Sequence, residues 1–282
     1  MITIVKGKNA MNDKRKLNIK EIKQLAIDIL KDFHEICEKN KLRYSVAYGT
    51  LLGTIRHEGF IPWDDDIDII MPRTDFEKFT KIANGQLDDN HRFISIDVEK
   101  KFMAPLAKII NTSTSLYEKE HMSRITLGVY IDIFVYDGLA ESKKKQARAF
   151  RIANILQKGW SFCECASYGK TIAVLRPIRK ICNKTMLARY FSKEINRRAK
   201  RYPFESSEYM GNNMFVAKYE ERNNTVFKSE EFQRLKDYKF ESITVKGFDN
   251  YDLFLSQWYA DYMKLPPKAQ QVSNHDFDVY WN

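Results

Sequence analysis

The chain has 282 residues, 44% of them hydrophobic, and carries 47 basic against 37 acidic residues, a formal net charge of +10. The hydrophobic fraction is that of a packed globular protein, and no uncharged apolar run reaches the roughly 18 residues needed to span a bilayer. The positive charge predicts an anionic partner: nucleotide phosphates, nucleic acid, anionic lipid or an acidic polymer. It does not choose among these, and an ordinary basic surface without a dedicated partner also fits it.

The four cysteines form no C-x-x-C pair, and the spacing of Cys163 and Cys165 has no second half that would complete a zinc site. Cys37 falls on the apolar face of a predicted helix, which indicates a core thiol, and free buried thiols suit a reducing compartment. Residues 1–16 are polar and basic and lack the apolar centre of a signal peptide. We therefore expect a cytoplasmic protein, able to rest on the inner face of the membrane.

The first part of the chain alternates predicted helices and strands. Residues 1–17 are expected to be a flexible lead-in. Apolar residues from Ile19 to Cys37 recur at helical spacing and predict one long amphipathic helix, followed by a strand over 42–48. Gly49-Thr50 breaks that strand, and a single helical turn over 51–56 is expected after it.

An acidic and aliphatic strand is predicted over 66–71, closed by Pro72. Thr74 or Asp75 is the expected N-cap of a helix that runs to about Asn84. The remaining predicted strands of this part cover 93–98, 106–110 and 129–136.

Residues 141–201 are strongly basic and mostly helical in pattern, interrupted at Pro177. Returning strands are expected over 208–217 and 240–246, and an aromatic-rich helix over 254–263. The fold class is therefore mixed α/β (α+β). The predicted organisation is a lead-in over 1–17, a catalytic core over 18–140, a basic helical insertion over 141–207 and a C-terminal part over 208–282 that packs back on the core.

Four carboxylates lie within five residues, at Asp64, Asp65, Asp66 and Asp68. On a strand, side chains two residues apart share a face, so Asp66 and Asp68 point the same way, and Asp64 joins them if the strand starts early. Like charges this close are costly unless a cation neutralises them, and oxygen-only ligands favour Mg²⁺ or Mn²⁺. The alternative is a solvated acidic loop.

Asp132 is the one acid in the apolar strand predicted over 129–136. A carboxylate there is costly unless it is paired or bound to metal. If this strand neighbours the first, three carboxylates can hold two metal ions. The alternative is a partly exposed aspartate on an edge strand.

Gly49-Thr50 lies between a strand and a helical turn, where backbone amides and a hydroxyl can bind phosphate. Arg56 and Lys108 are the cations that we expect on phosphate oxygens, because phosphoryl transfer depends on charge neutralisation. Either cation is equally compatible with an ordinary surface charge.

Three segments of the chain form a recognisable pattern. The longest runs from Tyr48-Gly49-Thr50-Leu51-Leu52-Gly53-Thr54-Ile55-Arg56-His57 to Gly59-Phe60-Ile61-Pro62-Trp63-Asp64-Asp65-Asp66-Ile67-Asp68-Ile69. The second is Ile131-Asp132-Ile133-Phe134 with Asp137-Gly138. The third is Trp258-Tyr259-Ala260-Asp261-Tyr262-Met263 with Leu265-Pro266-Pro267 and then His275. Together these segments resemble the LicD family, and the third departs from the family at Ala260, where a glycine is more usual.

The resemblance implies a DNA polymerase-beta-type nucleotidyltransferase core with a mixed sheet, in which Gly49-Thr50, the Asp66/Asp68 strand and Asp132 take the catalytic positions. It implies two Mg²⁺ (or Mn²⁺) ions held by Asp66, Asp68 and Asp132, with Asp64 as a further ligand. The implied reaction transfers a phospho-alcohol, in the first instance phosphocholine from CDP-choline, to a sugar of teichoic acid or lipopolysaccharide, with release of CMP. Relatives that move phosphoribitol leave the alcohol open.

Expected substrate contacts are Tyr48, Trp63 and Trp258 as a choline-binding aromatic set, together with Asp65 and His275. The basic 141–201 region is expected to steer a polyanionic, membrane-linked acceptor. Two other classes of function are open: transfer of a nucleotide from an NTP with release of pyrophosphate, and a non-catalytic glycan- or membrane-binding protein. No nucleic-acid-binding module is recognisable, so no nucleic acid partner is expected.

Overall fold

A computed structural model describes residues 14–85, 87–118, 125–164, 178, 181–182, 185–214, 219–272 and 277–282. The strands of this part are β1 (Ser45–Val46), β2 (Asp68–Pro72), β3 (His91–Ile94), β4 (Ala107–Asn111), β5 (Thr114–Glu118), β6 (Tyr130–Leu139), β7 (Tyr209–Gly211), β8 (Phe227–Lys228), β9 (Leu235–Phe240), β10 (Ile243–Phe248) and β11 (Phe277–Trp281). The α-helices are α2 (Ile19–Asn40), α3 (Tyr48–His57), α4 (Arg73–Ala83), α5 (Lys143–Glu164), α7 (Leu187–Ala199) and α8 (Tyr251–Tyr259). Short 3-10 helices are η2 (Phe204–Ser206), η3 (Tyr219–Thr225), η4 (Ser229–Gln233) and η5 (Lys268–Gln270).

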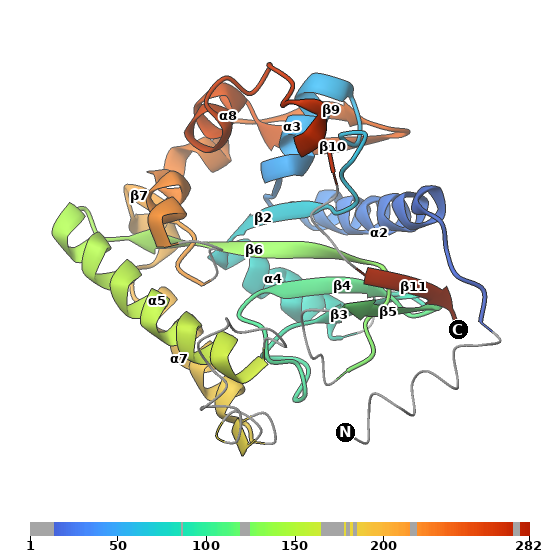
Figure 1. Ribbon diagram of the computed structural model, residues 1–282. Coiled ribbons are helices and arrows are strands. Elements are labelled where there is room, and N and C mark those ends of the chain that lie inside the picture. The colour runs from blue at the N-terminus through green and yellow to red at the C-terminus, as the bar shows by residue number, and fades with distance from the viewer. Residues whose placement is uncertain are drawn as a thin grey trace.

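One mixed sheet forms the centre of the molecule (Figure 1). Its strands lie in the order β1, β2, β6, β4, β3, and β7 pairs with β6 and β8 with β7. β2 and β6 are parallel, whereas β1–β2, β4–β6 and β3–β4 are antiparallel. The prediction of a mixed α/β fold is therefore confirmed. Because β2 and β6 start side by side, the first residues of these two strands and the segments that precede them lie close together.

α2 is the helix that the sequence predicts best. Asn18 caps its first turn by accepting from the N–H groups of Lys20 and Glu21, and the Glu21 side chain accepts from the Asn18 N–H. Its apolar face, which includes the fully buried Phe33 and Cys37, packs over β4, β6 and β10. The expected core position of Cys37 is confirmed.

Several boundaries differ from the sequence-based expectations. The strand expected over 42–48 is only two residues long, because a ten-residue helix, α3, begins at Tyr48 where a single turn was predicted from 51. β2 begins at Asp68, so Asp66 precedes the strand. α4 begins at Arg73 with Pro72 in the N-cap position, and Asp75 is buried in its first turn beside Arg43 instead of capping it.

The C-terminal part contains two strand pairings outside the central sheet. β9 and β10 form an antiparallel hairpin, and β10 lies against β1. β11 pairs with β5, a pairing that the sequence did not predict. Of the predicted lead-in, residues 14–17 are described: Lys16 bridges to Tyr280 and the Leu17 N–H donates to the Val279 carbonyl.

The expected helical region after 141 contains α5 and α7, which lie along each other (Figure 1). Arg189 ties α7 to the loop before β4 by donating to the carbonyls of Ile96, Glu99 and Phe102. No helix in the described ranges is both long and apolar enough to cross a membrane.

A buried ion pair closes the far end of β2 and β6. Arg73 follows β2 and donates to both carboxylate oxygens of Asp137, at 2.7 and 3.0 Å, with both side chains at most 7% exposed. Gly138 comes next, where a Cβ would lie 2.7 Å from the carbonyl oxygens of Tyr202 and Pro203. Asp137-Gly138 therefore fixes β6 against β2 and the following chain, which is a structural role.

Ala260 has φ of 51° and ψ of −109°, a conformation that glycine adopts freely and alanine does not. It ends α8, with its N–H donating to the Ser256 carbonyl. The glycine that is usual at this place in the LicD pattern thus has a physical reason, and its replacement by alanine strains the backbone directly after Tyr259.

Ala260→Gly should therefore stabilise the protein by about 1 kcal/mol, because it removes this strain. Thermal unfolding should shift upward by roughly 2–4 °C. Ala147→Gly, at an exposed interior position of α5, is the matched control and should cost about 1 kcal/mol instead. Equal destabilisation by both changes would contradict the assigned conformation.

Candidate active site

Asp68 and Asp132 lie opposite each other on the parallel strands β2 and β6. Across this pair the Asp132 N–H donates to the Ile67 carbonyl at 2.9 Å, and on the other side of β2 the Ala47 N–H donates to the Asp68 carbonyl at 2.9 Å. Neighbouring strands are about 4.8 Å apart, and paired residues point to the same face. Two acids that are far apart in sequence are therefore adjacent in space.

Asp64, Asp65 and Asp66 occupy the loop that leads into β2. Each offers a carboxylate oxygen, and these oxygens lie within 4.8 Å of one another. Ile61 and Ile67 are buried on either side and hold the loop in place. Asp66 and Asp68 are not paired by strand alternation as predicted, because β2 starts only at Asp68. The loop brings Asp66 close to Asp68 instead.

The acids repel one another electrostatically at this site. The pKa of Asp68 is raised well above its usual value, first by desolvation and then by the negative charges of Asp66, Asp132 and Asp64, whereas Lys108 opposes the shift. Excess negative charge on oxygen ligands in a partly desolvated position is what a hard divalent cation neutralises. The residues present therefore fit the expected Mg²⁺ or Mn²⁺.

The first turn of α3 touches both groups of acids. The Thr50 hydroxyl oxygen accepts from the Asp68 N–H at 2.8 Å, and Thr50 is buried. A Cβ on Gly49 would lie 2.6 Å from Asp64 Oδ2, so only glycine leaves room for that carboxylate. Tyr48, with φ of 46°, starts the helix in the left-handed region. The predicted phosphate-binding turn is thus a helix N-terminus, where the first amides are available to an anion.

Of the two predicted phosphate-binding cations, Lys108 lies among the acids and Arg56 contacts the C-terminal segment. Lys108 is opposite Asp132 in the β4–β6 register; its Nζ is 2.6 Å from Asp132 Oδ1 and 3.3 Å from the centre of the Tyr130 ring. The Arg56 guanidinium donates to the Tyr262 carbonyl at 2.7 Å, and desolvation lowers its pKa.

Lys23 of α2 is a neighbour of the site that the sequence did not indicate. Its Nζ is 3.4 Å from the carbonyl oxygens of Ile61 and Pro62, and burial lowers its pKa while Asp64 and Asp65 oppose that shift. Nothing in the helical pattern distinguishes Lys23 from other lysines of α2, since the contact depends on how α2 lies against the loop.

Two of the three predicted choline-binding aromatics lie together. Tyr48 and Trp258 meet edge to face with ring centres 4.9 Å apart, and Phe134 and Phe254 contact Tyr48 from other sides. Tyr48 is thus enclosed by packing. Trp63 is half-buried and makes no ring contact with Tyr48 or Trp258 among the described residues. His275 lies outside the described residues.

Tyr259, next to Trp258 at the end of α8, was also missed. Its pKa is raised by desolvation and then by the charges of Asp68 and Asp64, so its phenol lies near the acids. Tyr259 belongs to the third segment that resembles the LicD family, but a tyrosine at this position is equally compatible with a packing role.

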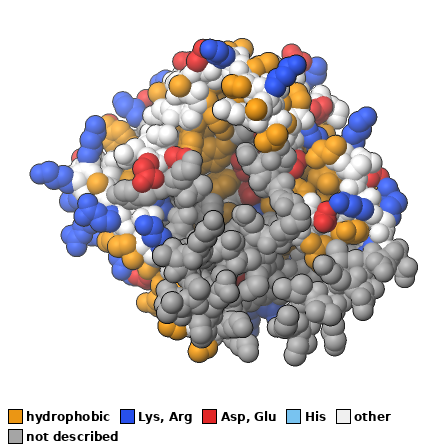
Figure 2. Space-filling model, in the orientation of Figure 1, with side chains coloured by type: hydrophobic (Ala, Val, Ile, Leu, Met, Phe, Trp, Pro, Cys, Tyr) orange, Lys and Arg blue, Asp and Glu red, His pale blue; other side chains and the backbone are white. Residues whose placement is uncertain are grey.

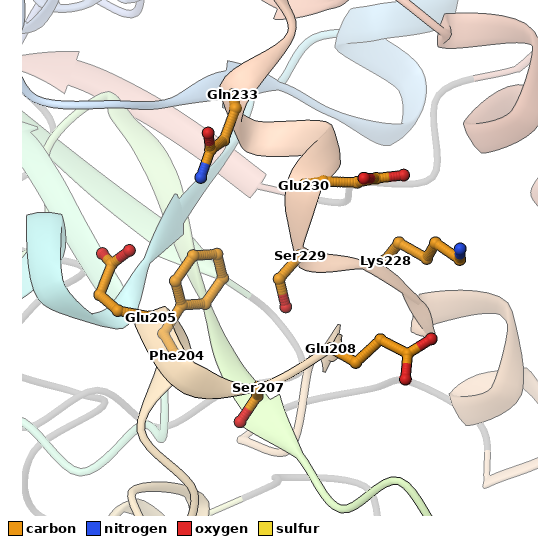
Figure 3. Close-up of a pocket in the computed structure, with 8 residues that line it drawn as sticks. All are labelled: Phe204, Glu205, Ser207, Glu208, Lys228, Ser229, Glu230 and Gln233. Carbon is orange, nitrogen blue, oxygen red and sulfur yellow. The ribbon is translucent and has the colours of Figure 1, made fainter.

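Two other features compete as sites. Asp32 and Asp88 form a second group of ligand-type side chains with His91, whose Nδ1 lies 2.6 and 2.9 Å from their carboxylates, so this group is already paired internally. A pocket shown in Figure 3 is lined by Phe204, Glu205, Ser207, Glu208, Lys228, Ser229, Glu230 and Gln233. Glu205 there pairs with Arg43 and Thr74, at the opposite end of β2 from Asp68. Neither feature contains a predicted site residue.

Comparisons with known proteins cover the segment that carries the acids. Residues 41–150 match the family model described as LicD/FKTN/FKRP, nucleotidyltransferase domain, which includes Asp64 to Asp68, Lys108 and Asp132. The chain is 28% identical over 274 residues to the lipopolysaccharide cholinephosphotransferase LicD of Haemophilus influenzae, covering 94% of this chain and 99% of that protein. Uncharacterized proteins of Rickettsia typhi and Rickettsia prowazekii are 42% and 46% identical over short stretches of 69 and 56 residues. The resemblance seen in the motifs is confirmed, and along nearly its whole length the chain is similar to an enzyme of the LicD type.

Proposed function

We propose that this enzyme transfers phosphocholine from CDP-choline to a sugar hydroxyl of a cell-surface glycan, with release of CMP. The observation that carries the proposal is the meeting of Asp68 and Asp132 on adjacent parallel strands within the LicD-type domain, beside the acidic loop. A relative that acts on lipopolysaccharide and aligns along nearly its whole length supports choline phosphate as the group and a glycan of that kind as the acceptor. Teichoic acid is the alternative acceptor.

The fold supports the proposal in outline. The parallel β2–β6 pair inside a mixed sheet, with α3 leading to β2, is compatible with a DNA polymerase-beta-type nucleotidyltransferase core, which is part of this proposal. The proposal also includes a cytoplasmic location at the inner face of the membrane, where a nucleotide-activated donor and a membrane-linked acceptor meet.

Asp66, Asp68 and Asp132, with Asp64, are the residues that would hold two Mg²⁺ or Mn²⁺ ions. When bound, these ions supply charge neutralisation on the diphosphate of the donor. Asp65, buried beside them, completes the acidic loop. Gly49 and Thr50 leave the first amides of α3 facing this region, where they bind a phosphate oxygen.

In the transfer, the acceptor hydroxyl oxygen forms a bond to the choline-bearing phosphorus and the bond from that phosphorus to the CMP oxygen breaks. Asp132 takes the proton of the acceptor hydroxyl. Lys108, 2.6 Å from Asp132, orients this carboxylate and offsets the charge that remains on CMP. Tyr259 lies near the acids at the end of α8 and Trp258 precedes it, and these are the aromatic residues that we assign to a choline headgroup.

The first test supplies the purified protein and Mg²⁺ with CDP-choline, CDP-ribitol or CDP-glycerol, with lipopolysaccharide or teichoic acid as acceptor, and measures CMP. We expect acceptor-dependent CMP release from CDP-choline that EDTA abolishes. Asp68→Asn should lower the rate of CMP release by more than the roughly 10–100-fold that is typical when a group that only supports a metal ligand is removed. Asp89→Asn, on an exposed turn, should leave that rate unchanged.

The competing reaction has a different product. Pyrophosphate release from an NTP with a nucleotide left on the acceptor would replace the proposal by nucleotidyl transfer at the same acids. Absence of CMP release from every CDP-alcohol would contradict phospho-alcohol transfer.

Gly49→Ala tests the close approach of α3 to the acidic loop. The new methyl group would occupy the place of the Asp64 carboxylate, so we expect at least a tenfold loss of kcat/KM, about 1.4 kcal/mol of transition-state stabilisation, with an unchanged circular dichroism spectrum. In an Asp64→Ala background the same change should have little further effect, because the clash is gone. Equal losses in both backgrounds would show that Gly49 acts independently of Asp64.

A further inference from the structure

The helix pair α5–α7 is basic on its exposed surface. Its exposed charged side chains are Lys143, Lys144, Lys145, Arg148, Arg151, Lys158, Lys193, Arg197, Arg198, Lys200 and Arg201. Figure 2 shows Lys and Arg side chains gathered at the edge of the molecule where α5 lies in Figure 1. Glu194, the acid on α7, is bound by Arg197 and Arg198. We call these basic side chains and the apolar ones between them the outer face.

Apolar side chains stand exposed within this face. Ile155 is 62% and Tyr190 61% exposed, and Met186 and Leu187 are also exposed. On α5 the positions 144, 148, 151, 155 and 158 follow one another at helical spacing and read Lys, Arg, Arg, Ile, Lys. On the α7 side, 186, 190, 193 and 197 read Met, Tyr, Lys, Arg. Both outward stripes thus mix cations with exposed hydrophobic groups.

These exposed groups are not the packing surface of the helices. The inner faces contribute Trp160, Cys163 and Ala188 to a small core with Met103. At the crossing, a Cβ on Gly159 would lie 2.7 Å from the Phe191 ring, so the helices already approach closely. The exposed apolar residues of the outer stripes are therefore not part of the packing between α5, α7 and the core.

We propose that this outer face docks on an anionic lipid surface. Basic side chains gain from the negative potential of such a surface, and interspersed apolar side chains gain by entering the headgroup region. A soluble polyanion would satisfy only the charges, whereas a lipid surface would also take up the exposed apolar side chains of Ile155 and Tyr190.

Attachment through the outer face would also hold the active site at a fixed position relative to the lipid surface. β6, which carries Asp132, continues into α5 after Leu139, and Arg189 fastens α7 to the loop before β4, which carries Lys108. The surface and the chemistry are nonetheless separable, so failure of vesicle binding leaves CMP release with a soluble acceptor unaffected, and the reverse also holds.

The test is cosedimentation of the full chain with vesicles of phosphatidylcholine alone or of phosphatidylcholine mixed with phosphatidylglycerol. We expect binding to the mixed vesicles only, weakened by salt. Arg151→Gln/Lys158→Gln should weaken it by an order of magnitude or more, since each cation contributes roughly fivefold. The control Lys39→Gln/Lys81→Gln, with the same charge change on exposed positions of α2 and α4, should bind as the unchanged protein does.

Ile155→Ser/Tyr190→Ser separates a lipid surface from a soluble polyanion. Weaker binding to mixed vesicles with unchanged binding to dextran sulfate supports the proposal. Unchanged binding to both would assign the outer face to a soluble polyanion and overturn it. Lack of binding to mixed vesicles, or equal losses in the Arg151/Lys158 and Lys39/Lys81 variants, would overturn it as well.

Discussion

The structure depends on holding several carboxylates together where two parallel strands begin. Asp68 and Asp132 are forced into adjacency by the β2–β6 register, and the loop before β2 adds Asp64, Asp65 and Asp66. Desolvation, and after it the repulsion among these acids, raises the pKa of Asp68. Folding must overcome this repulsion with interactions elsewhere along the same strands.

Those interactions lie in the rest of the two strands. Ile69, Ile70 and Met71 are fully buried immediately after Asp68, and burying such side chains contributes roughly 1.5–3 kcal/mol each. At the other end the Arg73–Asp137 pair joins the strands through two hydrogen bonds. The strand pair is therefore polar at both ends and apolar between them: one end is a compensated ion pair that fixes the register, and the other carries the excess negative charge that suits a cation.

Much of the site could be predicted from sequence because its signals are local. Four acids in five residues, a single acid in the apolar strand of Asp132 and the Gly49-Thr50 turn are each visible without a structure, and the LicD-like segments linked them. What could not be predicted depends on contacts between distant segments. Lys23 approaches the acidic loop only through the placement of α2, and Tyr259 approaches it only through the placement of α8.

The boundaries of several helices and strands also could not be predicted from the local sequence pattern. The helical turn expected from 51 is a full helix from Tyr48, whose positive φ no propensity would favour. The pairing of β5 with β11 joins two segments that are far apart in the sequence, and neither segment has an alternating pattern strong enough to predict the pairing. In contrast, α2 has a capping box and a continuous apolar face, and its start at Ile19 was predicted.

We propose that the acids at the start of β2 and β6 bind a divalent cation. Anomalous diffraction from crystals soaked in Mn²⁺ is the most direct test, because it locates the ion independently of activity. We expect a peak in contact with carboxylate oxygens of Asp66 and Asp68. A peak confined to the group of Asp32, Asp88 and His91, or none at the acids in crystals of active enzyme, would contradict it.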